Sequence, residues 1–135
     1  MELSQNVLEK FRVHLEFLGY KTTKDEYGAF VQSEQNFPRK ILITDKPSGF
    51  IFTCTYIARQ QAKMKPLGYF EWVNQINKTA VMIAAFISDN GDLTFAALFP
   101  KMYDKELFGG LFQTFCHDIE KSLFGQGNRT GEFLE

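Results

Sequence analysis

The sequence predicts a single α+β domain in which helices pack on an antiparallel sheet. Three observations lead to this fold class. The chain has 135 residues, of which 44% are hydrophobic, and this fits one globular domain with its own core. Apolar residues recur at spacings of three and four near both ends of the chain, as in amphipathic helices. Between these ends the period changes to two, and turn residues separate short runs rich in aromatic and β-branched residues.

The predicted order of elements is α-β-β-β-β-α-β-β-α. The first helix begins at Ser4, a typical N-cap residue, and ends at Gly19. Its apolar stripe comprises Val7, Leu8, Phe11, Leu15 and Leu18. Turn residues then divide the chain into four short antiparallel strands, of which the first has the weakest pattern. These strands are predicted at residues 20–24, 27–34, 39–45 and 50–58.

A basic polar connector, residues 59–65, leads to a short second helix that begins at Pro66. One side of this helix carries Phe70, Val73, Ile76 and Asn77. Residues 80–88 and 93–99 then predict a hairpin of two apolar strands. The Asn-Gly pair at its centre is typical of a type I′ turn.

Asp104 predicts the N-cap of a long final helix that ends at Gly125. Its broad apolar stripe comprises Leu107, Phe108, Leu111, Phe112, Phe115, Ile119 and Leu123. Residues 125–135 are rich in glycine and polar residues and predict a flexible tail, in which Leu134-Glu135 resembles residues added by cloning. The predicted domain therefore spans residues 1–124.

The formal charge and the apolar segments predict where the protein works. A formal charge of -1 provides no positive field that would draw the chain to nucleic acid or anionic lipid. The longest apolar stretch, residues 80–87, is far shorter than the roughly 20 residues of a membrane-spanning helix. The polar N-terminus lacks the pattern of a secretion signal. We therefore expect a cytoplasmic protein that binds neither nucleic acid nor membranes, with Cys54 and Cys116 as reduced thiols.

No motif indicates catalysis or a bound cofactor. His14 and His117 border apolar helix faces and lack the further ligands that a zinc site requires. The sequence has neither a Gly-x-Ser-x-Gly elbow nor a glycine-rich phosphate-binding loop. Asp89-Asn90-Gly91-Asp92 lacks the alternating oxygen ligands and the final glutamate of a calcium loop. We therefore expect a protein that is not an enzyme and holds no metal or cofactor.

Three features indicate partner binding. Gly109-Gly110 interrupts a helical pattern at a cost of about 1 kcal/mol per glycine, so either a second backbone approaches closely or the helix starts after Gly110. The hairpin is apolar on both faces, so one face needs cover from a second copy or a client. The third feature is a basic cluster in the connector. Together with the flank of the final helix, these features give the candidate partner-binding residues Leu107, Gly109, Gly110, Leu111, Arg59, Lys63 and Lys65.

These features favour a non-enzymatic protein-binding or regulatory module, a chaperone-like adaptor that acts through apolar surfaces of a homodimer. One alternative is a small-molecule sensor with its pocket in the phenylalanine-rich space between the final helix and the sheet. Another is an enzyme, which would need a pocket that holds His14 or His117 beside a carboxylate or a thiol.

Three segments carry a family resemblance. They are Leu15-Glu16-Phe17-Leu18-Gly19-Tyr20 at the end of the first helix, Phe70-Glu71-Trp72-Val73-Asn74-Gln75-Ile76-Asn77 before the hairpin, and Asp89-Asn90-Gly91-Asp92 in its turn. In this order of elements, over about residues 4–124, the chain resembles the YbjN family. That family is similar in fold to the type III secretion chaperones.

The resemblance implies a compact α+β domain, often dimeric, with its helices on one face of a curved antiparallel sheet. Secretion chaperones of this fold hold an extended client segment along grooves on the dimer surface. YbjN-like proteins are described as regulators without an established activity, so the family has no catalytic residues to transfer. The near-neutral charge of this chain differs from the acidic character of many secretion chaperones.

Two residues of the final helix can test which of its sides faces the core and which faces a partner. Phe112 follows the core-facing spacing, whereas Leu107 lies on the flank. We expect Phe112→Ala to lower the free energy of unfolding by about 3 to 5 kcal/mol, because it removes a buried ring. Leu107→Ala should leave folding nearly intact and weaken association. Thermal denaturation and light scattering measure the two effects, and the reverse pattern would show that the assignment is wrong.

Overall fold

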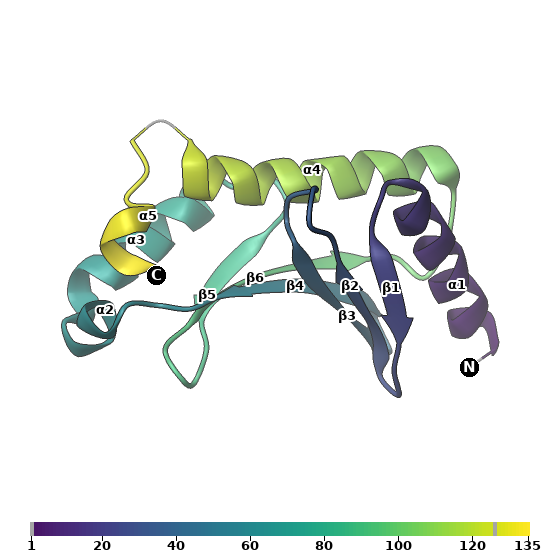
Figure 1. Cartoon of the computed structure of the whole chain (residues 1–135), viewed down its shortest axis with the longest axis horizontal. Helices are drawn as coiled ribbons and strands as arrows, with labels where there is room; N and C mark the ends of the chain where they lie inside the picture. Colours follow the sequence, from purple (N-terminus) through teal and green to yellow (C-terminus); the bar gives the residue numbers. More distant parts are fainter. Residues whose placement is uncertain (1, 126) are drawn as a thin grey trace.

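All the helices pack on one face or at one end of an antiparallel sheet (Figure 1). The structure is a computed structural model and describes residues 2–125 and 127–135. Its helices are α1 (Glu2–Phe17), α2 (Gln60–Met64), α3 (Pro66–Thr79), α4 (Lys105–Phe124) and α5 (Thr130–Phe133). Its strands are β1 (Lys21–Lys24), β2 (Gly28–Gln32), β3 (Lys40–Lys46), β4 (Gly49–Tyr56), β5 (Ala84–Ile87) and β6 (Leu93–Phe99). The predicted α+β class is confirmed, as is the first strand.

The six strands form one sheet in the order β1-β2-β3-β4-β6-β5. Every neighbouring pair is antiparallel. The first four strands follow one another as a meander, and the hairpin of β5 and β6 then adds to the free side of β4. The sheet therefore has two edges, β1 and β5.

The core lies between the sheet and α4, which runs across the sheet in Figure 1. Phe52 of β4 and Phe99 of β6 stack with ring centroids 3.9 Å apart. Phe108, Phe112 and Phe115 of α4 pack on this pair with centroid distances of 5.8 to 6.4 Å. Phe112 is 5% exposed and Leu107 is 41% exposed, so the predicted division between core and flank is confirmed.

Local signals explain where the main helices begin and end. Gly19 has a φ of 104°, and the N–H of Tyr20 donates to the Leu15 carbonyl at 3.0 Å, a Schellman arrangement that ends α1. The carboxylate of Asp104 accepts from the Leu107 N–H at 2.9 Å and caps α4, as predicted. The Ser4 prediction is wrong, because α1 already begins at Glu2. The Ser4 hydroxyl accepts instead from the Lys101 ammonium at 3.1 Å.

The hairpin forms, but two details of its prediction are wrong. Its first strand contains only Ala84–Ile87, because residues 80–83 turn toward α4. The turn is not type I′, since Gly91 has a positive φ of 91° whereas no described non-glycine residue has one. The N–H of Gly91 donates to the Ser88 carbonyl at 2.8 Å, and the N–H of Ser88 donates to the Asp92 carbonyl at 2.9 Å. This is a three-residue loop that ends in a glycine bulge.

Two predictions around the second helix need correction. The connector at residues 59–65 contains the helix α2, which buries Ala62. Helix α3 begins at Pro66 as predicted, but Phe70 is 53% exposed. Its buried side carries Tyr69, Trp72, Val73 and Ile76.

The predicted flexible tail is wrong for residues 130–134, because residues 130–133 form α5, and Phe133 and Leu134 join the core. The Phe133 ring stacks on Trp72 at 5.2 Å and on Tyr69 at 5.7 Å. Leu134 is 4% exposed and forms an antiparallel bridge with Ala58. Gln126 of the predicted tail and Met1 of the predicted domain lie outside the described residues.

None of the helices that the structure describes combines the length and the apolar character needed to cross a membrane.

The stacking of Phe133 gives a test of the C-terminal helix. We expect Phe133→Ala to lower the free energy of unfolding by about 3 to 5 kcal/mol, because this ring of α5 is buried against α3. The matched control is Phe17→Ala, since Phe17 is 86% exposed and should change stability little. Urea unfolding followed by the fluorescence of Trp72, the single tryptophan, measures both. Equal effects of the two variants would contradict the packing of α5.

Candidate functional site

The face of the sheet that points away from α4 carries the candidate site. Along β4, the side chains of Phe50, Phe52 and Cys54 are buried, whereas Ile51 and Thr53 are half-buried. Because side chains alternate along a strand, the second set points away from the helices. The same alternation on the other strands defines the outer face, whose centre comprises Phe30, Leu42, Thr44, Ile51, Thr53, Thr55, Ala84, Phe86, Thr94, Ala96 and Leu98.

The strand register arranges the outer face in three rows. The middle row runs across five strands and consists of Phe30, Leu42, Thr53, Ala96 and Ala84. One flanking row consists of Thr44, Ile51 and Leu98, and the other of Thr55, Thr94 and Phe86. Leu42, Phe86 and Leu98 are 43%, 47% and 52% exposed, so no part of the described chain covers them.

The centre of the outer face carries no charge, since the residues named above are apolar side chains, alanines and threonines. Lysines of the same face surround this centre. They are Lys40 and Lys46 at the two ends of β3, and Lys21 of β1, which lies in one row with Gln32 and Lys40. A surface with these properties binds through shape and apolar area rather than through charge.

One edge of the sheet, β5, is closed by side chains. The Asn77 amide donates to the Ala85 carbonyl at 2.9 Å and accepts from the Ala85 N–H at 2.7 Å. A strand added to this edge would need these same two groups, because they point away from β6. The Asn77 side chain occupies the place of a further strand, so β5 ends the sheet.

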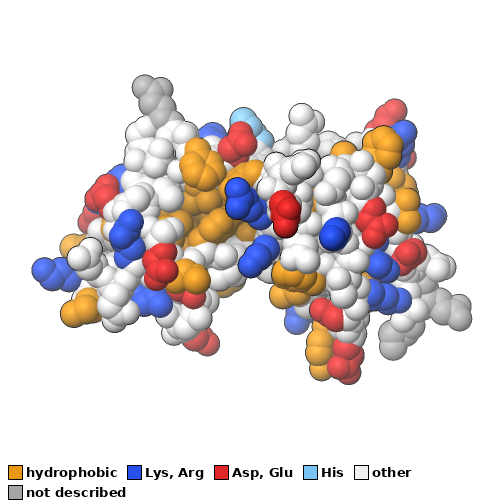
Figure 2. All heavy atoms as spheres, viewed as in Figure 1, with side chains coloured by type: hydrophobic (Ala, Val, Ile, Leu, Met, Phe, Trp, Pro, Cys, Tyr) orange, Lys and Arg blue, Asp and Glu red, His pale blue; other side chains and the backbone are white. Residues whose placement is uncertain are grey.

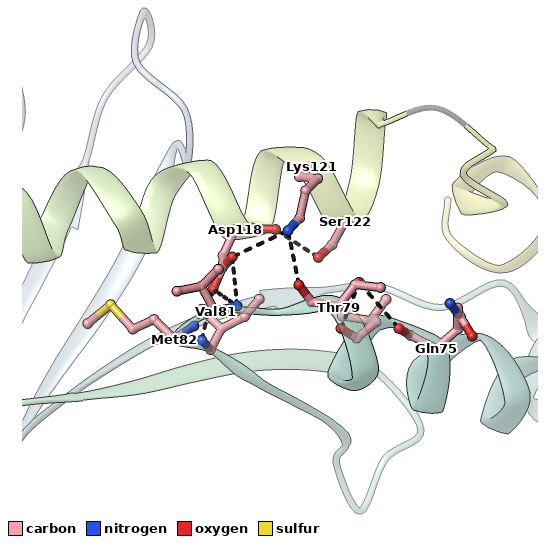
Figure 3. Close-up of polar contacts among 9 residues, drawn as sticks. Gln75, Thr79, Val81, Met82, Asp118, Lys121 and Ser122 are labelled. Atoms are coloured by element: carbon pink, nitrogen blue, oxygen red, sulfur yellow. Dashed lines mark hydrogen bonds and ion pairs between the residues drawn. The ribbon is translucent and has the colours of Figure 1, made fainter.

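The same edge continues into a buried carboxylate on α4 (Figure 3). Asp118 is 1% exposed, and its carboxylate accepts from three consecutive backbone N–H groups. The distances are 3.0 Å from Val81, 2.6 Å from Met82 and 3.1 Å from Ile83. These bonds pull residues 81–83 away from β6 and toward α4, which explains why β5 is short.

Lys121 completes this polar cluster. Its ammonium lies 3.9 Å from the Asp118 carboxylate and donates to the Thr79 carbonyl at 3.0 Å (Figure 3). The cluster therefore joins the end of α3, the start of the hairpin and α4. The sequence does not predict the role of Asp118. The residue lies beside the apolar stripe of the final helix, and no spacing along the chain shows that its carboxylate binds backbone N–H groups that precede β5.

The other edge, β1, is protected in a different way. Lys21 and Lys24 stand at its two ends and are exposed. Lysines on an edge strand oppose pairing with another chain, because pairing would bring like charges together and remove them from water. Both edges thus resist extension of the sheet, and the outer face is its accessible surface.

The predicted basic cluster does not lie beside the final helix. Arg59, Lys63 and Lys65 belong to α2 and its ends, on the opposite side of the molecule from the start of α4 (Figure 1). Lys63 has a structural partner, since its ammonium lies 3.3 Å from the Asp92 carboxylate. That carboxylate also accepts from the Ala58 N–H at 3.0 Å, and this bond, with the help of Lys63, lowers the pKa of Asp92.

The predicted residues of the final helix point in different directions. Gly109 and Gly110 both lie inside α4, so the alternative of a later helix start is wrong. A Cβ at Gly109 would lie 3.8 Å from the His14 ring, an ordinary contact, and one at Gly110 would meet nothing within 4 Å. Neither glycine is therefore needed for close approach of a backbone within this chain. Leu111 is half-buried against the core, and Leu107 is the more exposed residue of the flank.

The histidine and cysteine side chains have structural surroundings. The His14 Nδ1 lies 2.8 Å from the Tyr103 hydroxyl, and the ring packs on Phe108 at 4.9 Å. Burial, and then Lys105, lower the pKa of His14. Burial raises the pKa of Cys116 to about 12 and that of Cys54 further. Both thiols therefore stay protonated near neutral pH, the form that is a poor nucleophile.

One open cavity lies at the start of β1 and the loop between β2 and β3. Its volume is ≈ 760 Å³, and it is lined by Gly19, Lys21, Gln32, Ser33, Glu34, Gln35, Arg39 and Lys40. Figure 2 shows a separate hollow with hydrophobic side chains, with charged side chains near its rim. An apolar groove of ≈ 390 Å³ lies between α3 and β5 and is lined by Phe70, Val73, Asn74, Asn77 and Ile87. Within the described residues, no group of three or more His, Cys, Asp or Glu side chains could hold a metal ion.

Comparison with known proteins identifies the fold. No family model and no curated protein matches the sequence. The structure is similar to the crystal structure of YbjN from E. coli, described as "a putative transcription regulator", with a TM-score of 0.70 and 16% sequence identity. The match covers 95% of this chain and 95% of that chain. The chain has a YbjN-like fold. The likeness predicted from the sequence is confirmed, and at this identity it concerns the fold alone.

The Asp118 cluster can be tested through stability. We expect Asp118→Ala to lower the free energy of unfolding by roughly 3 kcal/mol or more, because it leaves three buried or half-buried N–H groups without an acceptor. Glu120→Ala on the exposed side of the same helix is the control and should cost less than about 0.5 kcal/mol. Chemical denaturation measures both. A loss as small for Asp118→Ala as for the control would contradict the role of this carboxylate.

Proposed function

We propose that the protein is a non-enzymatic, protein-binding regulatory module that works through the outer face of its YbjN-like sheet. One observation carries this proposal. The outer face presents apolar and threonine side chains across five strands, with Leu42, Phe86 and Leu98 about half exposed. Monomeric proteins rarely leave a contiguous apolar surface of this kind without a binding role.

The closed edges support the mode of binding. A partner that added a strand would have to displace the Asn77 amide from Ala85 at one edge or pair with lysine-flanked β1 at the other. A partner that packs on the outer face meets neither obstacle. The proposed module therefore binds face to face, as one layer on another.

The surroundings of the nucleophilic and acid-base groups support a non-enzymatic role. The His14 ring is held by Tyr103 and Phe108, and burial keeps both cysteines as thiols. The described cavities contain neither histidine nor cysteine in their linings. These groups contribute to packing, whereas none of the described residues covers the centre of the outer face.

The sensor alternative placed a pocket between the final helix and the sheet. In the structure this space is filled by phenylalanine rings, and Phe52, Phe99 and Phe115 are fully buried there. The predicted location therefore offers no room for a ligand, and we propose a protein partner instead.

The proposal also includes a regulatory role and a cytoplasmic location for the protein. YbjN of E. coli is described as "a putative transcription regulator", so a regulatory role is the first to examine. The near-neutral charge gives no field for nucleic acid, so we propose regulation through protein contacts in the cytoplasm, in the manner of a chaperone-like adaptor.

Quantitative pull-down tests the proposal. The wild-type chain and the variants Leu42→Lys and Leu98→Lys are immobilised in parallel, and captured proteins are compared by mass spectrometry. Val13→Lys is the matched control, since Val13 is an exposed apolar residue of α1 with 60% exposure. We expect specific partners to be lost from both outer-face variants and kept by the control, because a lysine on this face places a charge in the contact.

Two results would contradict the proposed function. One is a set of captured proteins that is the same for the wild type, the outer-face variants and the control. The other is a metabolite that co-purifies in stoichiometric amount while no protein does, which would favour the sensor.

A further inference from the structure

We infer that the open cavity at the start of β1 is a binding site for a small phosphorylated compound. The cavity lies at the border of the outer face, and it is separate from the phenylalanine-filled space between α4 and the sheet. The inference goes beyond the proposed function, because it assigns a small ligand to a site that does not depend on a protein partner.

Three strands bring the cations of the cavity together. The register pairs Lys21 of β1 with Gln32 of β2, and Gln32 with Lys40 of β3, so the three side chains stand in one row on one face. Two strand spacings separate the lysines, a Cα distance of about 10 Å. Because lysine side chains are long and flexible, both ammonium groups can reach one anion above Gln32. Arg39, which directly precedes β3, also lines the cavity and supplies a third cation.

The positive charge of the cavity is not neutralised by the part of the chain that the structure describes. Lys21, Arg39 and Lys40 take part in none of the ion pairs among these residues, whereas three other lysines each lie 2.5 to 3.9 Å from an aspartate carboxylate. Glu34 is the one carboxylate in the lining, which leaves a surplus of two positive charges. A phosphate monoester, with a charge of about −1.5 to −2 at neutral pH, matches this surplus.

Contacts with two helices hold the loop between β2 and β3 in place. The Asn36 amide donates to the Leu18 carbonyl at 2.8 Å and ties the loop to the end of α1. A Cβ at Gly19 would lie only 2.9 Å from the Asn36 Nδ2, so the glycine leaves room for this contact. The Phe37 ring packs on Phe124 of α4, with centroids 5.3 Å apart. A site held in this way loses little conformational freedom on binding, which favours affinity.

The volume and the lining indicate the class of ligand. The volume of ≈ 760 Å³ falls in the range of about 300 to 1,000 Å³ that is typical of small-molecule sites. The lining consists of glycine and of polar or charged residues, so the compound should be polar beyond its phosphate group. The amides of Gln32 and Gln35 can donate to hydroxyl groups and accept from them. The ligand class is therefore a phosphate ester of a hydroxylated compound, such as a sugar phosphate.

Isothermal titration calorimetry with ribose 5-phosphate tests the inference, with inorganic phosphate and ribose as comparison ligands. We expect one saturable site per chain with a Kd below about 1 mM for the ester, weaker binding of inorganic phosphate and no binding of ribose. Arg39→Ala and Lys40→Ala should each raise the Kd about tenfold, because each removes a charge-assisted hydrogen bond. The matched control is Lys46→Ala, an exposed lysine of the same face at the other end of β3, which should leave the Kd unchanged.

Thermal denaturation separates a binding role of these cations from a structural one. Arg39→Ala and Lys40→Ala should leave the Tm of the ligand-free chain unchanged or slightly higher, because each removes one of several like charges. Excess ribose 5-phosphate should raise the Tm of the wild type and of Lys46→Ala, and should raise it less in the two cavity variants.

Three results would overturn the inference. The first is a folded wild-type chain that shows no saturable binding of the ester. The second is an equal loss of affinity in Lys46→Ala and in the cavity variants, which would show a general effect of charge. The third is inorganic phosphate that binds as tightly as the ester, which would indicate an adventitious ion only. The pull-down with outer-face variants is independent of these measurements, so the proposed function stands if the cavity binds nothing.

Discussion

The packing of phenylalanine rings between α4 and the two central strands is the interaction on which the structure depends. Phe52 and Phe99 stack at 3.9 Å in the middle of the sheet, and α4 lays three rings on this pair. Phe11 brings α1 into the same cluster through Phe108 at 4.4 Å. Since each buried ring contributes several kcal/mol, these contacts decide which face of the sheet is covered.

The helices cover one face of the sheet and leave the outer face exposed. The helices at the far end, α2, α3 and α5, form a smaller aromatic cluster of Tyr69, Trp72 and Phe133 instead of crossing to the outer face. The described residues thus include no further element that covers Leu42, Phe86 and Leu98. The association that we propose for this face would supply a layer that the fold itself lacks.

Polar side chains decide where the sheet ends. Asn77 reproduces the donor and acceptor of a neighbouring strand at Ala85, and the Asp118 carboxylate collects the next N–H groups along the chain. A buried carboxylate is stable in such a place because several N–H groups point at it. These two residues separate an accessible face from an inaccessible edge, and they connect the stability of the hairpin to the way the protein can associate.

Local patterns in the sequence predict the fold class, the number and order of the strands, the main helices and the core side of the final helix. The hydrophobic periods, the Gly19 stop and the Asp104 cap each act on residues within a few positions. The length of β5, the packing of α5 and the choice of the apolar face that stays open are set in three dimensions. Those outcomes depend on contacts between distant residues, such as Asp118 with Met82 and Phe133 with Trp72, which no spacing along the chain reveals. The outer face escaped prediction for the same reason, because alternation shows that a strand has two faces, and only the position of the helices decides which one they cover.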